Sequence, residues 1–137
     1  MAVLVDSSFL YSLIDTRDDH HETAKLFLAT NKEDFIIPDV TLPEVTHVLN
    51  KRIGHHAVAV FLKAFLTLSI VLETITLADI ERSLNIMENY PEAKLDFVDC
   101  CLMALAERLT ITQVCTFDRR DFSIFRPVHC DYLELLP

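Results

Sequence analysis

The chain has 137 residues, of which 51% are hydrophobic and 24% charged, a composition typical of one globular domain and not of a disordered segment. A single glycine, Gly54, and five prolines are too few for an all-β fold with many tight turns. The formal net charge of −9 disfavours a basic nucleic-acid-binding surface, so a polyanionic ligand would require a metal ion or a basic partner that neutralises the acids.

Apolar strands and amphipathic helices alternate along the whole chain. In chain order, the predicted elements are a strand at residues 3–5, helices at 7–14 and 19–30, a strand at 35–38, helices at 41–52 and 56–69, a strand at 71–74, a helix from 76 that ends before Pro91, a helix at 96–109, a strand at 113–116 and a short strand at 129–132. This order predicts an α/β fold of three layers, with a central, mostly parallel sheet of four or five strands flanked by helices. Because no repeat or linker is visible, we expect residues 1–137 to form one domain.

Helix-capping residues support several of these starts and ends. Capping-box spacing occurs in three pairs: Asp19 and Glu22, Thr41 and Glu44, and Thr76 and Asp79. Gly54 stops the third predicted helix, whose last turn carries Lys51 and Arg52, where cations are favourable. Asp96 is the predicted cap of the last long helix.

Three features of the chain bear on its location in the cell: its first residues, its most apolar stretch and its cysteines. The first residues lack the basic region of a signal peptide and reach an acid at Asp6, which favours a cytoplasmic protein. Residues 57–77 are long enough for a membrane span, but Lys63 and Glu73 interrupt them, so we interpret them as a helix followed by a strand. Four cysteines without C-x-x-C spacing favour reduced thiols over a zinc site or disulfides.

Four acidic residues fall where predicted strands end or predicted helices begin: Asp6, Glu44, Asp99 and Asp118. The C-terminal ends of parallel strands and the N-terminal ends of the connecting helices share one edge of the sheet, and ligands of open α/β folds bind there. Carboxylates that gather at one edge repel each other unless a cation lies between them. Oxygen ligands alone suit Mg²⁺ or Mn²⁺, which can activate water and stabilise the charge of phosphodiester cleavage.

The same acids have an ordinary structural explanation as helix-capping groups. Glu44 completes a capping box, Asp99 lies in the first turn after Asp96, and each would stabilise its own helix. Asp118 could cap the short turn that follows it. Spacing alone does not distinguish capping from a metal site, so both interpretations stay open at this point.

Four segments carry a resemblance to a known family. They are Val-Leu-Val-Asp-Ser-Ser at residues 3–8, Leu-Pro-Glu-Val at 42–45, Leu-Asp-Phe-Val-Asp-Cys at 95–100 and Thr-Phe-Asp-Arg-Arg-Asp-Phe at 116–122. The first two motifs are weak, but the last two lie at the right separation, and the final one is close to a T-x-D-x-x-F signature. The whole chain resembles the PIN-domain family and, within it, the VapC-type toxins of bacterial and archaeal toxin–antitoxin pairs.

The resemblance implies a Mg²⁺- or Mn²⁺-dependent endoribonuclease that hydrolyses RNA phosphodiesters with a metal-activated water. The acidic quartet of the family, which binds the metal and carries the catalysis, matches Asp6, Glu44, Asp99 and Asp118. Thr116 matches a hydroxyl position near the metal. Asp96 is expected first to cap its helix and only second to support a metal ligand. Asp121 is a weaker candidate for the site, either as a further acid or as a solvated surface charge. The resemblance also implies a homodimer and an inhibitory antitoxin protein.

Rival functions follow from the same fold class. Some PIN domains have lost their acids and serve as non-catalytic scaffolds or partner-binding modules, and retention of all four acids here favours the enzyme. Ser8 stands where a D-x-D phosphatase needs its second acid. One glycine cannot build a P-loop or the G-x-S-x-G turn of a serine hydrolase.

Other residues have two interpretations each. Arg119 and Arg120 could hold RNA phosphate or form local ion pairs in a solvated turn. His47 ends an E-x-x-H motif, but that motif occurs once, and an ordinary histidine is the expectation. The helix at 56–69 is apolar on more than one face, which suits either core burial or a surface for a partner.

Overall fold

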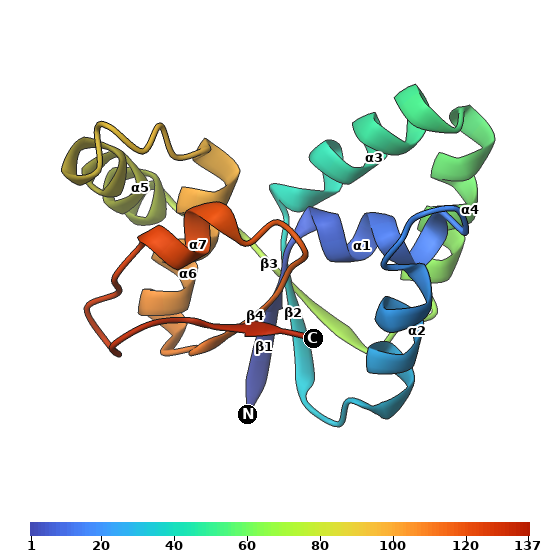
Figure 1. The fold of residues 1–137 in the computed structure, drawn as a ribbon, viewed down its shortest axis with the longest axis horizontal. Coiled ribbons are helices and arrows are strands. Elements are labelled where there is room, and N and C mark those ends of the chain that lie inside the picture. The colour runs from blue at the N-terminus through green and yellow to red at the C-terminus, as the bar shows by residue number, and fades with distance from the viewer.

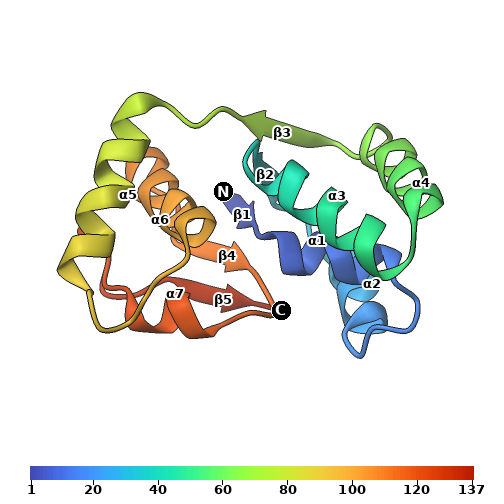
Figure 2. The same cartoon turned by 90° about the horizontal axis from the view of Figure 1, so that it is seen from above.

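The chain folds into one sheet with helices on both faces. The computed structural model describes all residues, 1–137. The strands are β1 (Ala2–Val5), β2 (Asp34–Pro38), β3 (Ile70–Glu73), β4 (Gln113–Cys115) and β5 (Glu134–Leu136). The helices are α1 (Ser7–Ile14), α2 (His21–Thr30), α3 (Thr41–Arg52), α4 (His55–Phe65), α5 (Leu77–Asn89), α6 (Phe97–Leu109) and α7 (Arg120–Ile124). Helices α1 to α4 cover one face of the sheet and α5 to α7 the other, so the predicted three-layer α/β fold is confirmed (Figures 1 and 2).

The five strands run parallel in the order β3-β2-β1-β4-β5, with β1 at the centre. From β1 the chain moves outward through β2 to β3, then crosses by way of α5 and α6 and continues through β4 to β5 on the other side (Figure 2). The strand order therefore reverses beside β1. The crevice outside the carboxyl ends of the strands at such a reversal is the usual ligand site of this architecture.

Strand β1 is buried on both faces, which explains its continuous apolar sequence. Val3 and Val5 pack into the core under α1 to α4, whereas Leu4 packs into the core under α5 to α7. All three are at most 1% exposed. Successive side chains of a strand point to opposite faces, so this short strand joins both cores and holds Asp6, the residue after it, in a fixed position.

Most predicted bounds agree with the structure, and those of α1 and α3 agree at both ends. The helix predicted at 56–69 ends at Phe65, because Thr67 and Leu68 form single turns with carbonyls three residues earlier. The final strand predicted at 129–132 was wrong, since β5 lies at Glu134–Leu136. Pairing with β4 selects these residues and continues as a hydrogen bond of 2.9 Å from the N–H of Thr116 to the carbonyl of Leu136.

Among the predicted capping boxes, the one in Thr76 and Asp79 forms with both of its hydrogen bonds. The box predicted for the second helix was wrong, because α2 begins at His21 and its N-cap makes no side-chain bond. The turn before α2 is held instead by Asp18, whose Oδ1 accepts the N–H of His20 at 2.8 Å.

No helix of this chain combines the length and the apolar character needed to cross a bilayer. Residues 57–77 contribute to α4 and β3 instead, as expected from their interrupting charges. All four cysteines are free thiols, as the spacing predicts, and Cys100, Cys101 and Cys115 are buried.

Candidate metal centre

Asp6 lies where the chain leaves β1 and starts α1. It takes the N-cap position with an extended backbone, but its side chain makes no capping bond. Its Oδ2 instead accepts hydrogen bonds from the hydroxyls of Thr116, at 2.8 Å, and Ser8, at 2.9 Å. The residue is 2% exposed, and its Oδ1 is buried without a hydrogen-bond partner.

Burial raises the pKa of Asp6 above its ordinary value, although the hydroxyl bonds from Thr116 and Ser8 act in the opposite direction. A buried polar oxygen that lacks a partner costs folding free energy, and native structures seldom leave one. The Oδ1 of Asp6 is therefore a position that a cation would satisfy.

Asp118 reaches the same edge of the sheet from the end of β4. Its backbone N–H donates to Oγ1 of Thr116 at 3.0 Å, so one threonine hydroxyl joins Asp118 to Asp6. The side chain of Asp118 is exposed, and its negative charge adds to the rise in the pKa of Asp6. Asp118 does not cap α7, whose N-cap is Arg119.

Glu44 lies half-buried in the first turn of α3. The predicted capping box with Thr41 is absent, because Val40 occupies the N-cap and the Thr41 hydroxyl donates to a carbonyl of β2 at 2.7 Å. Glu44 accepts a hydrogen bond from the hydroxyl of Ser7 instead. Burial raises the pKa of Glu44, and so do the negative charges of Asp6, Asp96 and Asp118.

Asp99 lies in the first turn of α6 and is 6% exposed. Burial, the charge of Asp6 and a hydrogen bond with Asp121 raise the pKa of Asp99 to about 9. Its carboxyl is therefore protonated at neutral pH when no cation is near. Asp121 is itself fixed, because it accepts hydrogen bonds from Arg120 at 2.6 Å and from the backbone N–H of Asp96 at 3.0 Å.

The remaining charged residues and the histidine weighed from the sequence are exposed. Asp96 is exposed and caps α6, since its side chain accepts the N–H of Val98 at 3.1 Å. Arg119 and Arg120 are exposed, and each donates to a backbone carbonyl, at 2.6 and 2.5 Å. His47 lies exposed on α3.

Two hydroxyls at the site were not singled out from the sequence as site residues. Ser7 holds Glu44, and Ser8 holds Asp6 while accepting the backbone N–H of Phe117 at 3.0 Å. Their position could have indicated this role, because both directly follow an acid at the end of a strand. The first turn of the helix that follows such a strand lies at the same edge of the sheet.

The four acids form no ion pair with any basic side chain; the ion pairs of the chain lie elsewhere. No group of three His, Cys, Asp or Glu side chains already lies in a metal-holding arrangement. Carboxylates without a cation between them repel each other, so some separation is expected. The residues fit a divalent cation of the Mg²⁺ or Mn²⁺ type, because they supply only hard oxygen donors and leave Oδ1 of Asp6 without a partner.

Known proteins resemble this chain in sequence or in fold. Ribonuclease VapC26 of Mycobacterium tuberculosis is 22% identical over 135 residues, which cover 98% of this chain and 100% of that protein. A crystal structure of VapC20 of M. tuberculosis, a toxin that cleaves the sarcin–ricin loop, matches with a TM-score of 0.83 at 26% identity, over 93% of this chain and 98% of that chain. A chain in a toxin–antitoxin complex from Klebsiella pneumoniae matches with a TM-score of 0.67 at 24% identity, over 88% of this chain and 90% of that chain. The PIN domain pattern matches residues 3–126, and the chain therefore belongs to the PIN domain family.

Proposed function

We propose that this chain is an endoribonuclease that depends on Mg²⁺ or Mn²⁺ and acts as the toxin of a toxin–antitoxin pair. The observation that carries the proposal is the buried Oδ1 of Asp6, which has no hydrogen-bond partner. None of the four acids forms an ion pair with a basic side chain. The relatives support RNA as the substrate, since one is named a ribonuclease and another is a toxin that cleaves the sarcin–ricin loop.

Asp6 and Asp99 are the buried ligands in this proposal. A bound divalent ion would supply the positive charge that activates water and stabilises the phosphate during cleavage. Thr116 and Ser8 orient the Asp6 carboxylate through Oδ2, which leaves Oδ1 for the ion. A divalent ion bound beside Asp99 would favour the charged form of its carboxyl group, because a nearby cation stabilises a carboxylate.

Glu44 and Asp118 complete the ligand set from the accessible side. Ser7 positions the Glu44 carboxylate, and the exposed Asp118 lies at the rim where a substrate would arrive. Because Asp118 is in contact with solvent, it is the acid best placed to take up a proton that leaves the attacking water.

Arg119 and Arg120 are the proposed RNA-phosphate contacts. A guanidinium group carries five N–H donors, and the bonds that these two side chains make within the protein leave several donors unused. They follow Asp118 directly in the chain. Together with the ion, they would offset the net charge of −9 at the place where phosphate binds.

An apolar groove supports the proposed antitoxin partner. Its volume is about 260 Å³, it lies between α1, α2 and α4, and eight of its nine lining residues are hydrophobic, among them Leu13, Phe61 and Phe65. Such a groove accepts the apolar face of a helix or of an extended peptide. The K. pneumoniae neighbour is a toxin–antitoxin complex, which agrees with a protein partner for this fold.

The homodimer and the cytoplasmic location stay predictions. Exposed Leu77, Ile80 and Leu84 form a stripe at helical spacing on α5, and such a stripe suits burial against a second copy. Four free thiols suit a reducing compartment.

RNA cleavage by the purified chain, freed of copurifying protein, tests the proposal. Cleavage is expected with Mg²⁺ or Mn²⁺ and not with EDTA, and Asp6→Asn and Asp99→Asn should both abolish it. Asp131→Asn changes an exposed acid outside the site and should leave it intact. Cleavage that persists in both site variants would contradict the assignment, and absence of both metal binding and cleavage would favour a non-catalytic scaffold.

A further inference from the structure

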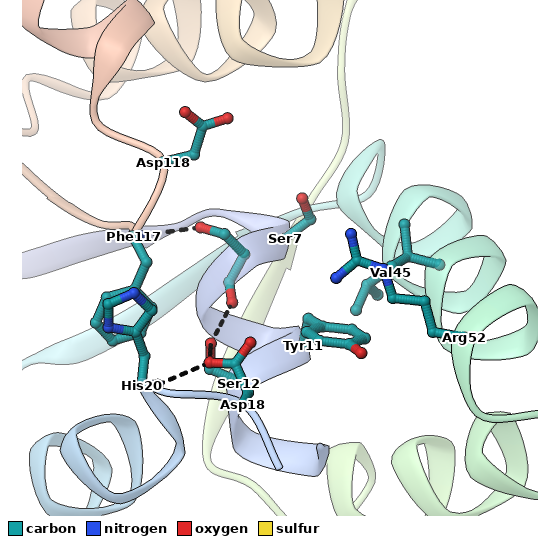
Figure 3. Close-up of a pocket in the computed structure, with 11 residues that line it drawn as sticks. Ser7, Tyr11, Ser12, Asp18, His20, Val45, Arg52, Phe117 and Asp118 are labelled. Atoms are coloured by element: carbon teal, nitrogen blue, oxygen red, sulfur yellow. Dashed lines mark hydrogen bonds between the residues drawn. The ribbon is translucent and has the colours of Figure 1, made fainter. Parts of the chain in front are cut away.

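A pocket of about 350 Å³ opens beside Asp118, one of the four acids (Figure 3). Asp118 and Ser7, the hydroxyl partner of Glu44, line both the pocket and the proposed metal centre. Ser8 also lines the pocket and donates to Asp6. The pocket therefore begins one hydrogen bond away from the Asp6 carboxylate that would bind the ion. If the ion held a phosphate of the RNA, the nucleotide next to that phosphate would reach the pocket.

Aromatic side chains line opposite sides of this pocket. The rings of His20 and Phe117 stack with centroids 4.2 Å apart and planes 8° apart, and Phe9 in the core also stacks on Phe117, so His20 carries the more exposed ring of this stack. On the other side, the guanidinium of Arg52 lies 5.3 Å from the centre of the Tyr11 ring (Figure 3). Aromatic rings and guanidinium planes are the surfaces on which proteins hold unpaired RNA bases.

Besides Asp118, one carboxylate and one guanidinium line the pocket, those of Asp18 and Arg52 (Figure 3). The Oδ1 of Asp18 accepts the Ser12 hydroxyl at 3.1 Å and the N–H of His20 at 2.8 Å, which fixes the carboxylate and leaves Oδ2 for a ligand. Arg52 forms no ion pair with any acid, and its contact with Tyr11 leaves several of its five N–H donors for a ligand.

A base that fits must offer N–H donors to the carboxylate and acceptors to the guanidinium. Guanine offers two acceptors, O6 and N7, to an arginine, and its adjacent N1–H and amino group can share the free Oδ2 of Asp18 as their acceptor. Adenine lacks the N1–H donor, cytosine lacks the paired acceptors, and uracil lacks the amino group. The volume also lies within the range of sites that enclose small organic groups.

We propose that this pocket binds a guanine base of the RNA beside the scissile phosphate, with Asp18 reading its donor edge and Arg52 its acceptor edge. The inference rests on the proposed ribonuclease function, because the metal centre is what would place the RNA backbone next to the pocket. It goes beyond that function in assigning a base preference to residues outside the acidic quartet.

Binding of short RNA probes tests the proposal without relying on cleavage. The probes are fluorescein-labelled 2′-O-methyl tetranucleotides UGUU, UAUU, UCUU and UUUU, measured by anisotropy with the full chain in Ca²⁺, and their integrity is checked on a gel. UGUU is expected to bind at least about ten-fold more tightly than the other three. Equal affinity for all four probes, or no binding at millimolar protein, would overturn the proposal.

Two variants separate base recognition from loss of structure. Asp18→Asn keeps an oxygen for Ser12 and His20 but places an amino group where guanine needs an acceptor, so UGUU should lose about ten-fold in affinity while the other probes change by less than about three-fold. Asp19→Asn, the exposed neighbour, is the matched control.

Arg52→Gln should likewise weaken UGUU selectively, with the exposed Lys51→Gln on the same helix as its control. A loss that is equal for all four probes would mean that Arg52 contacts phosphate, which overturns its assigned role. RNA cleavage without a guanine preference would overturn only this inference, whereas a guanine preference in a protein that never cleaves RNA would overturn only the proposed function.

Discussion

The Thr116 hydroxyl donates to Oδ2 of Asp6 over 2.8 Å, although 110 positions separate the two residues. Strand pairing creates this contact. Val5 of β1 lies level with Cys115 of β4, so the next residue of each chain segment leaves the sheet at the same height. A hydrogen bond of 3.0 Å from the N–H of Asp6 to the carbonyl of Cys115 closes the pairing. The centre of the proposed metal site is therefore built by the register of two neighbouring parallel strands.

Thr116→Val is expected to lower RNA cleavage by about 10- to 100-fold, the usual effect of removing a group that orients a metal ligand. Valine matches threonine in shape but cannot donate to Asp6 or accept the N–H of Asp118. Initial rates of cleavage at several Mg²⁺ concentrations would measure the effect, which should be partly compensated by more Mg²⁺. Thr116→Ser keeps the hydroxyl and should retain most of the rate, and an equal loss in both variants would contradict the orienting role.

Glu107 is expected to contribute to stability and not to cleavage. Two bonds from Arg82 of α5, at 2.6 and 3.1 Å, and one from the N–H of Val128, at 2.9 Å, reach this residue of α6. Burial disfavours its charge, but these bonds outweigh burial and hold the pKa of Glu107 below its usual value of 4.5. Glu107→Gln should therefore cost about 1–3 kcal/mol in the free energy of unfolding at pH 7.

The pH dependence of that cost follows from the direction of the shift. A carboxyl group with a lowered pKa in the folded state stabilises the protein above its unfolded pKa, and this contribution is lost as the pH falls through the folded value. Urea denaturation at pH 7 and near pH 3 should show the difference between Glu107→Gln and the unsubstituted chain shrinking in acid. A difference that is independent of pH, or a loss of RNA cleavage in the folded variant, would contradict this prediction.

The positions of the acids at strand ends and helix starts could be predicted from sequence, whereas several of their bonding partners could not. An apolar run followed by Asp6, and a helix start just before Asp99, are local patterns that place each residue at an end of its own element. Glu44 was equally compatible with a capping box, and its contact with Ser7 spans 37 positions. That contact depends on how α1 packs against α3, and this packing cannot be inferred from the spacing of residues along the chain.

The last strand illustrates the same limit on the prediction of the fold. Composition alone did not identify the final strand, because strand preference depends on the neighbour with which a strand pairs. Strand β4 pairs with Glu134–Leu136, which brings Leu135 into contact with one core and Leu136 with the other. The register of a distant partner decided the bounds of β5.

Mg²⁺ or Mn²⁺ is expected to raise the melting temperature of the metal-free protein, because an ion that binds only the folded state stabilises it by mass action. At an ion concentration one hundred times the dissociation constant, the gain is about 2.7 kcal/mol. Asp6→Asn should lose this gain, since it removes the charge from the oxygen that lacks a partner. Asp131→Asn should keep it, and an equal shift in both variants would place the bound ion elsewhere.

Asp99→Asn is expected to stabilise the metal-free protein as the pH rises. The pKa of Asp99 lies near 3.8 in the unfolded chain and is raised to about 9 in the folded one, so its favourable contribution is complete below about pH 3.8 and is lost as the pH rises through about 9. Asparagine has no proton to lose and can still donate to Asp121. In EDTA, the melting temperature of the variant should exceed that of the unsubstituted chain by a margin that widens between pH 5 and pH 8.5, to at least about 3 °C.

Saturating Mg²⁺ should make the unsubstituted chain the more stable of the two, because the Asp99 carboxylate is then a ligand and the amide of the variant is a weaker one. A margin that stays constant with pH in EDTA would mean that Asp99 is already ionised in the folded, metal-free protein.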